Sequence, residues 1–264
     1  MPSLSLAGVL IDLLFDPFAA RWPDVRDGAK AAEAAGFDGI WLYDHLAGEV
    51  HEAPDVLECW TTLSALATTV TGLSLGPLVL NVANRDPAIL AVMAATLQDV
   101  SAGRLLLGLG AGGGRGTPYA AEQEALGRTI PSDAGRRRAV EQAIATLRTV
   151  WSGTVDRVSG FLRPEPAPPI VVGGFGPKMA ELAGRLGDGI NAPAGSRFAQ
   201  LVDIARRAHA DSGRDREPFV VTASAGASRR QLDGLAEMGV DRAVIYVAPP
   251  YTDGVNRIRA AVRT

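Results

Sequence analysis

The strongest candidate for chemistry is His45, which follows Asp44 directly after an apolar stretch that predicts a buried strand over Asp38–Tyr43. An imidazole at a strand end can give a proton to a ligand or take one from it, and a neighbouring carboxylate can fix its tautomer. We therefore predict His45 as catalytic, with Asp44 beside it. The alternative is a histidine that bonds to a local carbonyl and only closes the strand. The pattern places His51 in a surface loop and His209 on the polar side of a helix.

A second candidate is the glycine-rich turn inside Ile170–Lys178, between a β-branched strand and a helix that begins at Pro177. Such a turn points backbone N–H groups outward at the positive end of the helix dipole, where a phosphate or another anion can bind. The alternative is a tight turn that needs glycine only for its backbone angles. The residues of the turn are Gly173, Gly174, Phe175 and Gly176.

A third candidate is the segment Gly108-Leu109-Gly110-Ala111-Gly112, which resembles half of a dinucleotide-binding fingerprint. Gly113 completes the Gly-x-Gly-x-x-Gly spacing, but no helix start follows promptly, so the motif alone is weak evidence. At the mouth of a barrel, the same glycines leave room for a flat ligand to lie against the backbone.

Strands and helices alternate along the chain, and this alternation must position the candidates. The predicted strands are Leu6–Leu13, Asp38–Tyr43, Leu73–Leu80, Arg104–Leu109, one opening at Ile170, Asp188–Asn191, Phe219–Ala223 and Ala243–Val247. The predicted helices are Trp22–Ala35, Pro54–Thr69, Pro87–Val100, Asp133–Trp151, one ending at Leu186, Arg197–Ser212, Ser228–Gly239 and Thr252–Val262.

Eight strand–helix units with nearly continuous apolar strands predict one α/β domain over residues 1–264, a closed (β/α)8 TIM barrel. A doubly wound sheet with two extra units is the alternative. The interval 110–132 is too long and too rich in glycine for an ordinary connection and is expected to be functional. In a barrel, the active site lies at the carboxyl ends of the strands. Polar candidates there include Asp12, Asp16, Asn81, Tyr119, Glu122, Asn191, Thr222 and Tyr246.

The composition excludes several classes of protein. An apolar share of 47% with a charged share of 21% is typical of a globular protein with a large core. The net charge of −3 gives no reason to expect nucleic acid or an anionic membrane as partner. No apolar run approaches the roughly 18 residues of a membrane span, and the N-terminus lacks the basic start of a signal peptide. One cysteine, Cys59, and three scattered histidines show no metal-ligand spacing. We expect a cytoplasmic protein without a metal.

Four segments in order along nearly the whole chain resemble the bacterial luciferase-like superfamily, most closely its branch of deazaflavin (coenzyme F420)-dependent oxidoreductases. These segments are Ala34–Leu46, Leu75–Leu80 with Arg85–Ala88, Ala95–Arg104 with Leu107–Gly112, and Pro169–Pro177 with Gly187–Asn191. The resemblance is less specific for the cofactor, because flavin-dependent relatives share the barrel.

The resemblance implies a luciferase-like barrel that holds a flat deazaflavin ring across the strand ends, near Asp44 and His45. It implies a non-prolyl cis peptide near Leu78–Val79 behind the ring, and a phosphate of the cofactor tail on the loop Gly173–Gly176. It also implies a homodimer, for which the helices Pro54–Thr69 and Pro87–Val100 could supply the interface. The residues expected to bind the cofactor are Asp44, Leu78, Val79, Asn81, Gly110, Ala111, Gly112, Gly173, Gly174, Phe175 and Gly176.

Two departures from the resemblance bear on the substrate. The sugar-phosphate dehydrogenases of this branch have a glutamate where this chain has Gly113 and a tryptophan where it has Glu49, so glucose 6-phosphate is not expected. Glu49, Glu122 and Glu124 are carboxylates within reach, but the pattern favours solvated positions for all three.

We therefore expect F420-dependent hydride transfer to or from an unidentified small organic substrate. The first alternative is a monooxygenase that uses reduced flavin mononucleotide (FMN), and the second is a cofactor-binding paralogue without catalysis. A sugar-phosphate isomerase or aldolase on the same fold is disfavoured, because no lysine is expected at a strand end.

Overall fold

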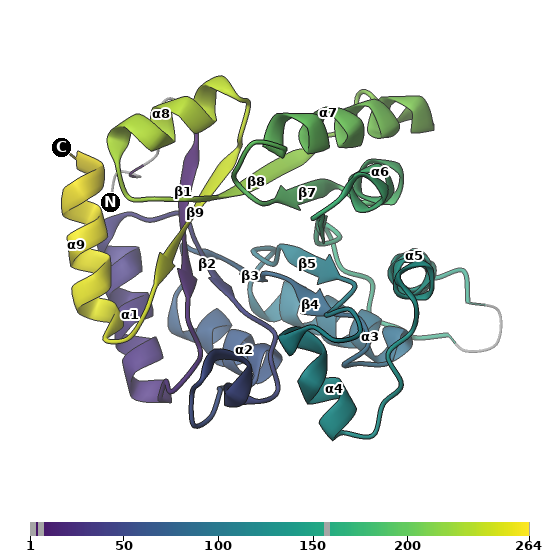
Figure 1. The fold of residues 1–264 in the computed structure, drawn as a ribbon, viewed down its shortest axis with the longest axis horizontal. Coiled ribbons are helices and arrows are strands. Elements are labelled where there is room, and N and C mark those ends of the chain that lie inside the picture. The colour runs from purple at the N-terminus through teal and green to yellow at the C-terminus, as the bar shows by residue number, and fades with distance from the viewer. Residues whose placement is uncertain (1–3, 5–7, 156–158, 264) are drawn as a thin grey trace.

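A computed structural model of the chain describes residues 4, 8–155 and 159–263. Within these residues, parallel strands form one sheet in the order β3-β2-β1-β9-β8-β7-β6-β5-β4, with helices around it (Figure 1). The strands are β1 (Leu10–Phe15), β2 (Gly39–Leu42), β3 (Ser74–Pro77), β4 (Leu80–Asn81), β5 (Leu107–Gly110), β6 (Ile170–Gly173), β7 (Gly189–Ala192), β8 (Val220–Ala225) and β9 (Arg242–Val247).

The α-helices cover the outside of the sheet, and α9 packs beside α1 where the first and last strands meet (Figure 1). They are α1 (Trp22–Ala35), α2 (Cys59–Thr69), α3 (Pro87–Val100), α4 (Ala121–Ala125), α5 (Asp133–Ser152), α6 (Pro177–Leu186), α7 (Phe198–His209), α8 (Arg229–Glu237) and α9 (Tyr251–Arg263). Short helical turns are η1 (Gly48–His51), η2 (Pro118–Ala120) and η3 (Ala210–Arg214). No helix in the described part of the chain is long and apolar enough to cross a membrane.

The third predicted strand, Leu73–Leu80, is divided into β3 and β4, and the barrel closes at this place. A cis peptide joins Leu78 to Val79 and separates β3 from β4, as the resemblance implied. On the other side, Leu75 N donates to Arg104 O at 3.0 Å and Leu106 N donates to Leu75 O at 2.9 Å, so β3 pairs with the segment that leads into β5. Since β3 and β4 together fill one position, the nine strands make an eight-position barrel, and the predicted (β/α)8 fold is confirmed.

Local sequence signals set most helix boundaries. The predicted bounds of α3 are confirmed, because Asp86 accepts from Ala88 N at 2.9 Å and Ile89 N at 3.1 Å, and Pro87 occupies the first turn. The predicted start of the second helix at Pro54 is wrong. Val56 instead pairs with Phe18 in an isolated antiparallel bridge, and the helix begins only at Cys59.

The first predicted strand also needs correction. Residues 6 and 7 lie outside the described part of the chain, and β1 ends at Phe15 rather than at Leu13. Asp12 therefore lies inside β1 and not at its carboxyl end. Its carboxylate is fully buried and accepts from Arg242 Nε at 2.7 Å and from Trp41 Nε1 at 2.8 Å. Asp12 closes the amino-terminal side of the barrel interior and is not a site residue.

Above this ion pair, one part of the barrel interior is apolar. Leu14, Trp41, Leu78 and Val244 form a small buried cluster there, separate from the larger core between sheet and helices. The parallel register places Asp16, Tyr43 and Tyr246 one step further toward the carboxyl ends. This polar end of the barrel holds the candidate site.

Candidate active site

His45 follows β2 and meets a glutamate that is distant in the sequence. Its Nδ1 lies 3.3 Å from Glu122 Oε2, and the same oxygen accepts from Leu46 N at 2.8 Å. The Glu122 side chain is 2% exposed, so the prediction of a solvated Glu122 is wrong. The prediction that Asp44 fixes the His45 tautomer is also wrong, because Glu122 has that position.

The protonation of Glu122 determines the tautomer of His45. Burial alone would raise the pKa of Glu122, but hydrogen bonds from His45 and from the Leu46 and Ala47 backbone lower it below its ordinary value. Glu122 is therefore a carboxylate at neutral pH and has acceptors only. His45 must then donate through Nδ1, which leaves Nε2 as the ring nitrogen that can exchange a proton with a ligand.

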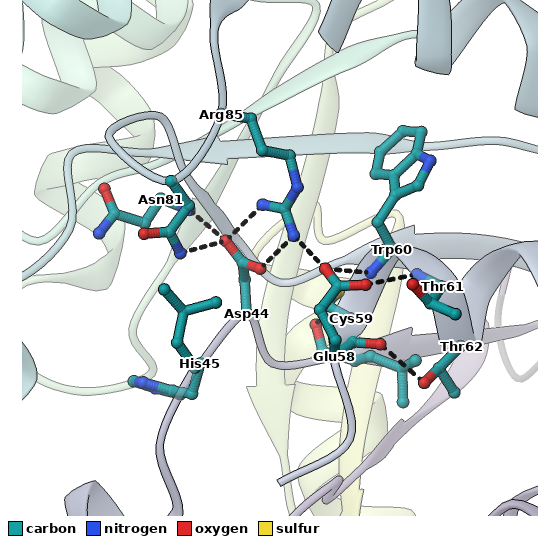
Figure 2. A network of polar contacts seen from close by, with 12 residues as sticks. Asp44, His45, Glu58, Cys59, Trp60, Thr61, Thr62, Asn81 and Arg85 are labelled. Atoms are coloured by element: carbon teal, nitrogen blue, oxygen red, sulfur yellow. Dashed lines mark hydrogen bonds and ion pairs between the residues drawn. The ribbon is translucent and has the colours of Figure 1, made fainter. Parts of the chain in front are cut away.

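Asp44 belongs to a buried network that holds the loops around His45 (Figure 2). Its side chain is fully buried and accepts four hydrogen bonds, from Asn81 N at 2.9 Å, Asn84 Nδ2 at 3.1 Å, and the two Arg85 nitrogens at 2.9 and 3.0 Å. Figure 2 shows the Asp44 carboxylate turned toward Arg85 and Asn81 and away from the His45 ring. Asp44 therefore joins the end of β2 to the turn after β4. Its carboxylate oxygens accept their hydrogen bonds from that turn and not from His45.

Arg85 extends the network to the start of α2, where its guanidinium also contacts the Glu58 carboxylate. Glu58 caps this helix by accepting from Trp60 N at 3.0 Å and Thr61 N at 2.7 Å. Burial lowers the pKa of Arg85, but the hydrogen bonds and charges of Asp44 and Glu58 outweigh it and raise the pKa above its usual range. Arg85 therefore stays charged and joins three chain segments.

The predicted ring-binding residues come together at the carboxyl ends of β3 to β6. Val79, after the cis peptide, lies against two glycines: a Cβ at Gly110 would collide with its Cγ2, and a Cβ at Gly173 would lie 2.9 Å from it. Gly112 has a φ of +66° and would place a Cβ 2.5 Å from the Asn81 amide. Only glycine fits at these places, so bare backbone and the Val79 side chain form one surface at the barrel mouth. Leu78 lies beneath it in the interior cluster, and the carbonyl of Ala111 accepts from Arg136.

The glycine turn after β6 has fewer free donors than the sequence predicted. Gly174 N donates to Asn191 O at 2.9 Å, so this N–H is not available to an anion. Among the described residues, the N–H groups of Phe175, Gly176 and Lys178 have no acceptor. Gly176 is the N-cap of α6 with an extended φ of −152°, and a Cβ there would meet nothing within 4 Å. The geometry suits an anion at this helix start.

Rings from the segments after β1, β2 and β5 lie around His45. Phe18 lies 5.4 Å and Tyr119 6.0 Å from the His45 ring, measured between centroids, and His51 lies 5.5 Å away. Tyr43 completes the group at 6.3 Å. We name Phe18, Tyr43, His45, His51 and Tyr119 the mouth cluster. His51 is exposed, as the sequence indicated. No local sequence motif marks Phe18, so the sequence alone does not predict its place beside His45.

His209, in contrast, is not part of the site. It is 4% exposed, so its predicted position on the polar side of a helix is wrong. Its ring lies 4.7 Å from the ring of Phe219, and its Nε2 lies 3.3 Å from Glu217 O. These contacts are at the end of α7 and before β8, on the amino-terminal side of the barrel.

Comparison with known proteins identifies the family. The model of the luciferase-like monooxygenase family matches residues 11–256, and the chain belongs to this family. Among curated proteins, it is 27% identical over 228 residues to an F420-dependent glucose-6-phosphate dehydrogenase of Nakamurella multipartita, covering 82% of this chain and 63% of that protein. It is 29% identical over 224 residues to an F420-dependent hydroxymycolic acid dehydrogenase of Mycobacterium tuberculosis, covering 78% of this chain and 61% of that protein. The chain thus spans less than two thirds of the length of these relatives.

Solved structures agree on the fold. An F420-dependent secondary alcohol dehydrogenase in complex with an F420-acetone adduct superposes with a TM-score of 0.79 at 18% identity, covering 96% of this chain and 98% of that one. The oxygenating constituent of 3,6-diketocamphane monooxygenase from Pseudomonas putida, in complex with FMN, gives a TM-score of 0.66 at 17% identity over 82% of this chain and 67% of that one. Both cofactor types therefore occur on this barrel.

Proposed function

We propose that the protein is a coenzyme F420-dependent oxidoreductase that transfers a hydride between the deazaflavin and a small organic substrate. The proposal rests on one observation: three features lie together at the carboxyl-terminal rim of the barrel. These are the bare surface at Val79, Gly110 and Gly173, the free N–H groups at the start of α6, and the His45–Glu122 pair. The relatives named above, which are F420-dependent dehydrogenases, support the same class of reaction.

The described residues fit the cofactor. The apolar Val79 side chain is partly exposed, which suits contact with one face of a tricyclic ring, and the donors of Phe175, Gly176 and Lys178 suit a phosphate of its tail. When bound, the deazaflavin supplies a carbon that accepts or gives the hydride.

Side chains of the protein itself position His45 and transfer the substrate proton. His45 is the proposed catalytic residue, because an alcohol that loses a hydride must also lose its hydroxyl proton, and a carbonyl that gains one must gain a proton. Glu122 and Asp44 are positioning residues: Glu122 holds the His45 tautomer, and Asp44 holds the loop that carries His45. The buried Leu78 and the Val79 side chain back the ring.

The anion site at α6 gives the first prediction. Gly176→Asp is expected to weaken F420 binding by about tenfold or more, or roughly 1.4 kcal/mol, because a carboxylate then faces the phosphate. Gly176→Asn is the matched control, because asparagine and aspartate are equally good N-caps and the extended backbone accepts both. Quenching of F420 fluorescence measures binding without turnover. Equal affinities for the two variants would show that no phosphate lies at this helix start.

We also propose that the protein works as a homodimer in the cytoplasm, with α2 and α3 at the interface. A groove of about 370 Å³ lies between these helices, and its lining is largely apolar. Ile89 and Val92, on α3, are 59% and 38% exposed, and Val92 lines the groove, so apolar surface is available there for a partner. The groove residues are Trp60, Ser64, Val92, Met93, Thr96, Leu97 and Val100.

The dimer proposal predicts that Val92→Glu converts the protein to a monomer, because each copy would place a charge in an apolar contact. Met238→Glu is the control, since Met238 is 44% exposed after α8, away from the groove. Sedimentation equilibrium measures the mass. A monomeric wild-type protein, or a Val92→Glu variant that remains dimeric, would contradict this interface.

A further inference from the structure

We propose that Arg136 is a positioning residue for the cofactor: it holds the backbone of Gly112 and Gly113 so that their N–H groups face the edge of the ring. This inference rests on the proposed function, because it assigns how the same site holds the ring. It is supported by the carbonyl groups that Arg136 binds, by the N–H groups that these contacts leave free, and by the cost of placing a guanidinium there.

Arg136 lies near the start of α5, and its guanidinium reaches the segment that follows β5. Its Nη1 donates to Ala111 O at 3.3 Å and also to Gly112 O. Its Nη2 pairs with Asp133 at 2.9 Å, and the Arg136 side chain is 17% exposed. One side chain from a helix therefore fixes two successive carbonyl groups of a glycine-rich segment at the barrel mouth.

The two carbonyl contacts determine where the neighbouring N–H groups point. The peptide bonds from Ala111 to Gly113 are trans, so each carbonyl group and the N–H group of the next residue point in opposite directions. The N–H groups of Gly112 and Gly113 are thus turned away from α5, and neither has an acceptor among the described residues. Gly112 lies against the Asn81 amide, so these donors lie beside the surface proposed for the ring. Carbonyl oxygens at the ring edge are suitable acceptors for them.

The position of Arg136 is a poor one for stability alone. A cation near the start of a helix opposes the helix dipole. The carboxylate partner, Asp133, is 80% exposed, and such a surface pair contributes little. The Arg136 Nε is buried without a hydrogen-bond partner in the described part of the chain, which costs free energy. The gain from this placement therefore lies mainly in the two carbonyl contacts.

The first test measures the order of the segment without any cofactor, by NMR relaxation of backbone amides in the full chain. Arg136→Met is expected to lower the order parameters of Gly112 and Gly113 from about 0.85 to below about 0.6. Gly153, which ends α5 at its other end, is the internal control for folding and is expected to stay unchanged. Arg138→Met is the matched control, because Arg138 is exposed on the same helix and its loss removes the same charge.

The second test measures F420 binding by fluorescence quenching. Arg136→Met is expected to weaken binding by at least about tenfold, or about 1.4 kcal/mol, whereas Arg138→Met is expected to bind F420 as the wild type does. Arg136→Lys is expected to recover part of the loss, since lysine keeps the charge but not the planar fork of donors. The shift of the F420 absorbance band on binding is expected to be smaller in Arg136→Met, because fewer hydrogen bonds then reach the ring edge.

Equal order parameters for Gly112 and Gly113 in Arg136→Met and the wild type overturn the inference, whether or not F420 binds. An equal loss of order in Arg138→Met also overturns it, as does an unchanged F420 affinity of Arg136→Met. A wild type that does not bind F420 overturns the proposed function, and the cofactor-free NMR measurement still decides whether Arg136 holds the segment.

Discussion

Replacing His45 with alanine is expected to lower kcat by about 10²–10⁴-fold, the range typical for loss of a general acid or base. F420 binding is expected to change little, because the bare surface at Val79 and the donors at the start of α6 do not involve the imidazole. The rate is followed by F420 absorbance, with whichever alcohol or carbonyl compound the loaded wild type turns over. A lower kcat with an unchanged affinity for F420 is the result expected for a residue that transfers a proton.

Two variants separate His45 from its surroundings. His51→Ala removes a ring from the same cluster and is expected to affect KM more than kcat, since in the described part of the chain no carboxylate bonds to the His51 ring. Glu122→Ala is expected to lower kcat less than His45→Ala, and to shift the apo His45 ring from the Nδ1–H form toward the Nε2–H form in nitrogen NMR spectra. Full turnover by His45→Ala would contradict the assignment, and a protein with no turnover at all would favour the non-catalytic paralogue.

Replacing Arg85 with methionine is expected to destabilise the protein by about 3–5 kcal/mol, because it leaves the Asp44 carboxylate buried without an opposite charge. The Asn81 and Asn84 donors remain, but they do not neutralise the carboxylate. The same change removes one of the hydrogen bonds that lower the pKa of Glu58. Urea unfolding measures the loss in the free energy of unfolding.

The control for Arg85→Met is Arg21→Met. Arg21 also makes a two-bond pair with an aspartate, Asp55, at 2.8 Å for both bonds, but on the exposed surface. Water and salt screen such a pair, so little change in stability is expected. Equal losses for the two variants would mean that the buried network has no special role in holding the loop of His45.

The features that sequence predicted well have local causes. The start of α3 at Asp86-Pro87 follows from a capping side chain and a proline in the first turn, which need no distant partner. The alternation of apolar strands and amphipathic helices similarly predicted the barrel. The break at Leu78–Val79 came from the resemblance alone, because no local rule marks a cis peptide between these residue types.

The features that sequence missed depend on distant contacts. The sequence pattern favours a solvated position for Glu122, and only the folded loop brings its carboxylate 3.3 Å from His45. Asp44 looked like a partner of His45 because the two are adjacent, yet successive side chains after a strand point in different directions. Asp44 therefore meets Arg85 instead.

One titration decides whether this barrel binds F420 rather than FMN. Purified protein is titrated with F420, and separately with reduced FMN under anaerobic conditions, with binding followed by fluorescence quenching. F420 is expected to bind at least about tenfold more tightly than reduced FMN, a difference of about 1.4 kcal/mol. Tighter binding of reduced FMN, followed by oxygen consumption when air is admitted, would contradict it and identify a monooxygenase.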